Sequence, residues 1–291
     1  MSAPSVLYDV PGPKAKTRNA VYTVLFLLAL AGVGWWIIAT LAEKDQLTWQ
    51  KWGPFFTEGQ VWTTFIFPGL LNTLIAAGLA IVIALPIGSL FGILRLSDHV
   101  WIRVPAGTVV EFFRAVPVLI LMFFANEFYS EYTDVDSDYR PLLAVVTALV
   151  LYNGAVLAEV VRAGIQSLPT GQTEAAKAIG MRKTQTMTNV LLPQAVTAML
   201  PAIVSQLVVI VKDTALGGAA LGFSDLFSQI RPISNNYFAN TIATLTIVAV
   251  IYILLNNLLT AAAGWLEKWS RQRKTSSGTV VKPLDDGNNE L

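Results

Sequence analysis

The sequence predicts an all-α polytopic membrane protein. Of its 291 residues 54% are hydrophobic, and only 13% are charged, about half the charged share of an ordinary soluble domain. Uncharged runs recur at lengths that meet or approach the roughly 20 residues needed to cross about 30 Å of hydrocarbon. Their apolar character is continuous instead of alternating, which favours helices over a closed β-barrel, because backbone polar groups in lipid need hydrogen-bond partners.

Six membrane spans are predicted. In chain order they cover residues 20–42, 65–94, 101–126, 141–158, 184–211 and 232–266. The first is longer than the apolar core of a cleaved signal peptide, so we expect it to stay as a helix. The third contains Glu111 and Arg114 within its length.

The distribution of Lys and Arg predicts the orientation, because these cations are retained on the cytoplasmic side of membrane helices. With the N-terminus inside, 14 of them fall on the cytoplasmic side, 4 fall outside, and Arg114 and Lys212 stay within spans. Both termini are therefore predicted to be cytoplasmic. The tails 1–19 and 270–291 are polar and rich in turn-forming residues, and we expect them to lack fixed structure.

A polar stretch on the predicted cytoplasmic side, EAAKAIGMRKTQTMTNVLLP, covers residues 174–193. We expect a short helix capped by Thr170 or Thr173, with Glu174 in its first turn and Gly180 ending or bending it. Small and aliphatic side chains give this helix an apolar face: Ala175, Ala176 and Ile179. An exposed apolar face on a loop implies a partner, although a helix lying among lipid headgroups would show the same pattern.

The spacing of this stretch resembles a known family signature. Glu-Ala-Ala, three residues, Gly180, nine residues and then Val-Leu-Leu-Pro is similar to the loop of importer-type ABC permeases. Segments such as EFFRAVPVLILMFF and LLPQAVTAMLPAIVSQLVVIVKDTALG resemble the polar amino acid subfamily over residues 66–268, and VLYDVPGPKAKTRN resembles actinobacterial glutamate permease subunits. The resemblance implies a five-helix permease domain at 62–269, preceded by an added helix at 20–42.

In that family the loop, here at about 168–190, docks on a cytoplasmic ATPase. The resemblance assigns this contact to Glu174, Ala175, Ala176, Ile179 and Gly180. It also implies a cytoplasmic ABC ATPase dimer, a second homologous permease subunit forming a heterodimer, an extracellular substrate-binding lipoprotein and membrane lipid as partners, and no nucleic acid. The chain has no G-x-x-x-x-G-K-[ST] phosphate loop, so ATP and Mg are expected on the ATPase and no cofactor in this chain.

Charged residues within the predicted spans are the candidates for a substrate pathway, because such residues usually face a bundle interior or an aqueous path. Glu111 with Arg114 and Glu159 with Arg162 are spaced as i,i+3 helix pairs. The candidate pathway residues are Arg114, Asn153, Glu159, Lys212, Asp213 and Thr214. The alternative is that these groups only lock helices together or hold a dimer interface.

The sequence thus predicts a non-enzymatic pore subunit of an ATP-driven importer for glutamate in the bacterial plasma membrane. A permease for glutamine, aspartate or arginine is an alternative. An ion-driven secondary transporter or channel, and a membrane scaffold or sensor, are others. No catalytic or metal site is expected, since the chain has no cysteine and one histidine.

Overall fold

The computed structural model describes residues 12–275, and every regular element in that range is a helix. The first part of the chain forms α1 (Pro13–Glu43), α2 (Trp49–Trp52), α3 (Pro54–Thr57), the π-helical turn η1 (Val61–Ile66), α4 (Phe67–Leu94), α5 (Val100–Ala115) and α6 (Val118–Tyr132). The second part forms α7 (Arg140–Gln166), α8 (Thr170–Ala178), α9 (Lys183–Thr186), the π-helical turn η2 (Met187–Leu191), α10 (Leu192–Leu221), α11 (Ile230–Asn236) and α12 (Thr241–Thr275). The all-α prediction is confirmed.

Five segments in this range are single helical spans long and apolar enough to cross a membrane. They are Pro13–Glu43, Val61–Leu94, Arg140–Gln166, Lys183–Leu221 and Thr241–Trp265. Part of each tail that was expected to lack fixed structure is helical: residues 13–19 belong to α1 and residues 270–275 to α12. The remainder of both tails, 1–11 and 276–291, lies outside the described residues.

The span predicted at 101–126 is two helices, not one. α5 and α6 meet at an angle of 100°. Val116 ends α5 with an extended backbone, at φ −81° and ψ 127°, directly before Pro117. A proline disfavours the helical conformation of the residue before it, and so the chain turns sharply within this apolar run.

The run predicted as one span at 232–266 is also broken. The chain turns between α11 and α12, where Phe238 and Ala239 have φ values of 55° and 53°. The ammonium of Lys51 in α2 donates hydrogen bonds to the carbonyls of Phe238 (2.8 Å) and Ala239 (3.3 Å). This long-range contact holds a left-handed turn that residues with a Cβ seldom adopt, so the span begins only at Thr241.

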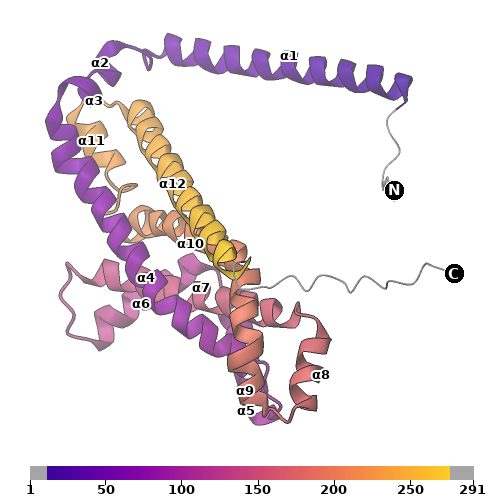
Figure 1. The fold of residues 1–291 in the computed structure, drawn as a ribbon. Helices are drawn as coiled ribbons and strands as arrows, with labels where there is room; N and C mark the ends of the chain where they lie inside the picture. The colour runs from indigo at the N-terminus through magenta and orange to yellow at the C-terminus, as the bar shows by residue number, and fades with distance from the viewer. Residues whose placement is uncertain (1–11, 276–291) are drawn as a thin grey trace.

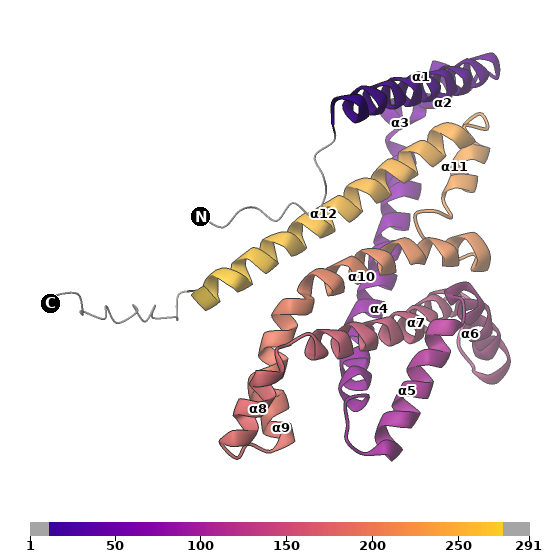
Figure 2. The same cartoon turned by 90° about the vertical axis from the view of Figure 1, so that its right-hand side faces the viewer.

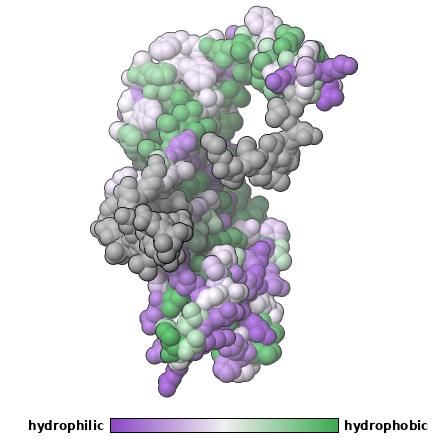
Figure 3. All heavy atoms as spheres, turned by 45° about the vertical axis from the view of Figure 1, so that its right-hand side comes forward, coloured by the Kyte–Doolittle hydropathy of each residue, from purple (hydrophilic) through white to green (hydrophobic). Residues whose placement is uncertain are grey.

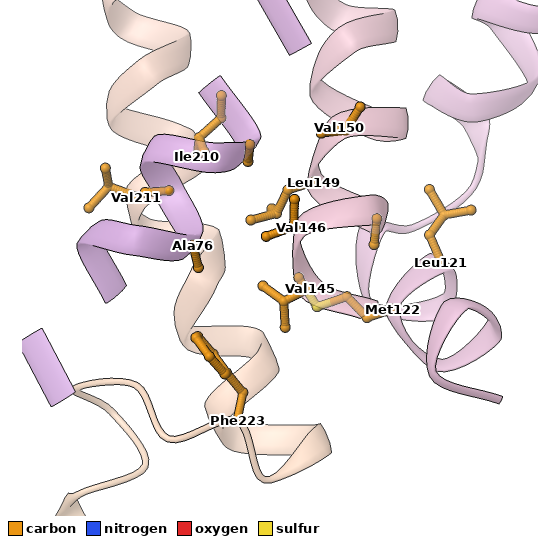
Figure 4. Packing of buried hydrophobic residues seen from close by; sticks show 13 residues of the cluster. Ala76, Leu121, Met122, Val145, Val146, Leu149, Val150, Ile210, Val211 and Phe223 are labelled. Carbon is orange, nitrogen blue, oxygen red and sulfur yellow. The ribbon is translucent and has the colours of Figure 1, made fainter. Parts of the chain in front are cut away.

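Helix α7 is the centre of the bundle, and α4, α5, α6 and α10 pack around it (Figures 1 and 2). Figure 4 shows side chains from four of these helices meeting in one cluster, among them Ala76, Met122, Leu149 and Ile210. On the face seen in Figure 3, hydrophobic side chains cover much of the upper part, and hydrophilic side chains gather at the lower end, which carries α8 and α9 in Figure 1. Helix α1 lies apart from this bundle and has no buried residue (Figure 1).

Candidate functional site

Helix α8 forms the exposed end of the molecule, and its boundaries follow from local backbone chemistry. It begins at Thr170 after an extended Pro169 and ends at Ala178, two residues before Gly180, whose φ is 79°. The predicted stop at Gly180 is confirmed, because glycine takes a positive φ at little cost. The predicted cap is wrong: neither Thr170 nor Thr173 caps the helix, which starts early enough to place Glu174 beyond its first turn.

The predicted apolar face of α8 is divided between two sides. Ala176 is buried, with 4% of its surface exposed. Glu174, Ala175 and Gly180 are exposed, and Ile179 projects outward with 77% of its surface exposed. An isoleucine with this exposure beside an exposed alanine is a small apolar surface at the tip of a polar loop.

A second candidate site is an ion network centred on Glu159 of α7. Its carboxylate contacts Arg95 at 2.6 Å and Arg114 at 3.7 Å, and Arg162 on the next turn of α7 donates to both of its oxygens. Arg95 also contacts Glu111 at 3.1 Å. The predicted pair Glu159–Arg162 is therefore present.

The predicted pair Glu111–Arg114 is wrong. These residues share α5, yet each one contacts a residue of another part of the chain: Glu111 binds Arg95, which directly follows α4, and Arg114 approaches Glu159. The packing of α5 and α4 against α7 brings these charges together, and contacts between helices prevail over the i,i+3 spacing.

A polar cavity of about 450 Å³ opens beside this network. It is lined by Arg95, Arg103, Val104, Gly107, Thr108, Glu111, Arg162 and Gln166. Together the network and the cavity hold four arginines (Arg95, Arg103, Arg114 and Arg162) and two glutamates (Glu111 and Glu159), an excess of two positive charges. Such an arrangement attracts an anion, because guanidinium groups match carboxylates with paired hydrogen bonds.

The remaining predicted pathway residues are elsewhere. Asn153 is fully buried, accepts a hydrogen bond from the amide of Gln206 and donates one to the carbonyl of Leu149. Thr214 is buried and donates to a backbone carbonyl of its own helix. On the same helix Lys212 is exposed and Asp213 is half-buried, and no salt bridge involves either within residues 12–275.

Two polar features were missed by sequence reasoning. The sequence indicates Arg95 only as a cation that sets orientation, because its partner Glu159 is 64 residues away. Asp225, in the segment after α10, is fully buried and accepts hydrogen bonds from the amide of Ser228 (2.9 Å) and the hydroxyl of Tyr252 (3.2 Å). The one available signal was an acidic residue within the apolar sequence GFSDLF.

Comparison with known proteins assigns this architecture. Residues 84–272 match the family described as "binding-protein-dependent transport system inner membrane component". The chain belongs to this family. It is an amino acid ABC importer permease and an inner membrane component; its homologues are permease subunits of ABC transporters, which are pore components and not catalytic ones.

The permease is similar to the glutamate transport system permease protein GluD of Corynebacterium glutamicum, with 44% identity over 243 residues that cover 83% of this chain and 88% of GluD. The arginine transport system permease protein ArgU of the same organism is 25% identical over 263 residues, covering 87% of this chain and 81% of ArgU. A crystal structure of an amino acid ABC transporter with histidines is 29% identical, with a TM-score of 0.62, covering 71% of this chain and 94% of that one.

Proposed function

We propose that this permease forms the membrane pathway of an ATP-driven importer for glutamate. Its similarity to GluD is the observation that carries the proposal: it is 44% identical to that glutamate permease and 25% identical to an arginine permease of the same organism. The resemblance to amino acid permeases named in the sequence analysis is confirmed at the level of the family. The assignment of glutamate as the substrate rests on the difference between these two identities and on the chemistry of the ion network.

The charge around Glu159 supports an acidic substrate. Glutamate carries two carboxylates and one ammonium group, so its net charge opposes the excess of two positive charges in the network and cavity. Arg114 is the arginine of the network held most weakly, at 3.7 Å from Glu159, and its side chain is 40% exposed. It is the group best placed to exchange a protein carboxylate for one on the substrate. A cationic substrate such as arginine would be repelled.

The energy source in this proposal is a separate ATPase that docks on the exposed tip of α8, on the cytoplasmic side. Ile179, Ala175 and Glu174 present a small apolar surface with a charged edge, and such a surface suits a shallow protein cleft. Closure of the ATPase dimer would move α8 and shift the bundle between outward-open and inward-open states. A second permease subunit and an extracellular substrate-binding lipoprotein complete the proposed assembly.

Two experiments on the complete complex test the proposal. Affinity purification of the permease in mild detergent is expected to retain an ATPase, and vesicles carrying the complex are expected to accumulate radiolabelled glutamate with ATP but not with a non-hydrolysable analogue. Accumulation driven by an ion gradient without ATP would instead identify a secondary transporter. A lone permease oligomer without ATPase would point to a scaffold or sensor.

A further inference from the structure

One ion pair ties the segment 179–191 that follows α8 to the turn between α4 and α5. The ammonium of Lys183 lies 2.5 Å from a carboxylate oxygen of Asp98 and donates a second hydrogen bond, of 2.8 Å, to the backbone carbonyl of Leu96. No other salt bridge in residues 12–275 involves any residue of α8 or of that segment. The charges of this pair belong to neither the tip of α8 nor the network around Glu159.

Lys183 is held firmly relative to α8. The turn between the two is closed by hydrogen bonds from the amide of Gly180 to the carbonyl of Lys177 (2.9 Å) and from the amide of Met181 to the carbonyl of Ala176 (3.0 Å). Lys183 is the first residue of α9, whose start is fixed by the side chain of Gln185 accepting from the amide of Arg182 at 2.9 Å. A displacement of α8 is therefore expected to carry the backbone of Lys183 with it.

The α4–α5 turn, which Lys183 contacts, is adjacent in sequence to Arg95 of the ion network. Leu96 and Asp98 belong to a tight turn, in which the amide of Leu96 donates to the carbonyl of Ile93 (2.9 Å) and the amide of Ser97 to that of Leu94 (3.1 Å). Arg95 is the residue next to Leu96, and its guanidinium contacts both Glu159 and Glu111. A pull on this turn would move the arginine that joins two carboxylates of the network.

The ion pair lies between two cavities, where the α4–α5 turn meets α9. Cavities of about 410 Å³ and 310 Å³ flank it, and Asp98, Lys183 and Met187 line both of them. The α4–α5 turn and α9 are thus incompletely packed where they meet. The charged link crosses the space between these cavities, beside the apolar contacts that Ile93 and Leu96 share with Met187 and Leu191 in one cluster.

We propose that Lys183 is a positioning residue of transport, which transmits movement of α8 through Asp98 and Leu96 to Arg95 and so to the carboxylate network around Glu159. This inference rests on the proposed function, in which α8 is moved by an ATPase. It adds a second route from α8 into the bundle, beside the direct chain connection through α10. Its physical basis is a series of contacts: the ion pair and hydrogen bond of Lys183 to the α4–α5 turn, the backbone from Leu96 to Arg95, and the ion pairs of Arg95 with Glu159 and Glu111.

The carboxylate of Asp98 in this link is stabilised by its surroundings. The hydrogen bond and the positive charge of Lys183 lower the pKa of the Asp98 carboxyl below its ordinary value, with smaller contributions in the same direction from His99 and Lys177. About half of the Lys183 side chain (49%) and most of the Asp98 side chain (78%) are exposed. Exposed ion pairs add little to folding stability, so variants that lack this one are expected to fold and assemble.

The test measures glutamate transported per ATP hydrolysed in vesicles carrying the complete complex. Lys183→Met and Asp98→Asn are each expected to lower this ratio by about 5-fold or more, the lower end of typical coupling between sites, while ATP hydrolysis continues. The double variant is expected to be no worse than either single one, because both changes break the same link. Lys183→Arg, which can make both hydrogen bonds, should keep most of the ratio, and Lys16→Met on α1 is the matched charge-removal control.

An unchanged ratio in both single variants, or losses that simply add in the double variant, would overturn the inference. Its failure is distinguishable from failure of the proposed function. If the wild-type complex accumulates glutamate with ATP and Lys183→Met behaves like it, only the link is wrong. If the wild-type complex shows no ATP-dependent accumulation, the proposed function fails first.

Discussion

Helices α1 and α7 are alike in apolar character and opposite in packing. Both are long and apolar enough to cross a membrane, yet none of the most apolar window of α1 is buried, against 61% of that window in α7. α1 is lined with large side chains such as Phe26, Trp35 and Trp36, which are at least 65% exposed. Hydropathy therefore identifies helices that enter lipid, but does not say which of them form the protein's core.

Close contacts at small residues and ion pairs distinguish the buried helix α7 from the exposed helix α1. The centre of α7 carries Gly154, Ala155 and Ala158, which let α4 approach closely, and it carries Glu159, which binds arginines from its neighbours. In lipid there is little hydrophobic force between helices, so close backbone contact and polar bonds decide which helices associate. α1 also contains small residues, but no helix packs on its glycines: a Cβ added at Gly32 or Gly34 would meet nothing within 4 Å, and no salt bridge of the described residues involves α1.

The largest effect is expected where α4 touches α7. A side chain added at Gly92 would lie 2.7 Å from the carbonyl of Ala158 and 2.8 Å from the side chain of Val161. We expect Gly92→Leu to abolish stable assembly, because backbone cannot move aside for it. The measurement is the yield of monodisperse permease by size-exclusion chromatography. Gly78→Leu, on the same helix but in open space, is the control and should purify normally.

A smaller but specific effect is expected at the ion network. Arg114→Ala should lower glutamate uptake at least about tenfold, consistent with loss of a charge-assisted hydrogen bond of about 1.5–3 kcal/mol, while the complex still assembles. Uptake of radiolabelled glutamate into vesicles measures this, with Arg231→Ala on α11 as a control. Unchanged uptake would show that Arg114 does not contact the substrate and that the network only holds the helices together.

The sequence predicted what depends on local chemistry. Run length and apolarity predicted the spans that are single helices, although the last begins later than expected, and the glycine at 180 predicted the end of α8, since each depends on neighbouring residues only. It did not predict Arg95 as the partner of Glu159, because that contact needs two helices to be placed side by side. The turn at Phe238 and Ala239 was missed for the same reason: Lys51, which holds it, is 187 residues away from Phe238.

An intermediate effect is expected at Gly180. The residue has a φ of 79° but open space where a side chain would go, so Gly180→Ala adds only backbone strain, roughly 1 kcal/mol. We expect it to weaken binding of the ATPase by about 5-fold, the factor that such an energy gives. Gly180→Arg should also place a bulky cation beside the docking surface and prevent co-purification. Gly171→Ala, equally open but without a positive φ, is the control.

The smallest effect is expected on α1. Leu27→Ala with Leu28→Ala should change the thermal stability of the purified permease by less than about 0.5 kcal/mol, since both side chains are more than half exposed. Leu149→Ala on α7, where the side chain is fully buried, should cost about 2–5 kcal/mol. Equal losses in the two variants would show that α1 packs on the bundle as closely as α7 does.

The most direct test of the whole account is a competition experiment on radiolabelled glutamate uptake by vesicles that carry the complete complex. Excess unlabelled glutamate is expected to suppress uptake fully and aspartate in part, because both present two carboxylates to a network with an excess of arginines. Arginine is expected to have no effect. Suppression by arginine or glutamine equal to that by glutamate would contradict an acidic substrate.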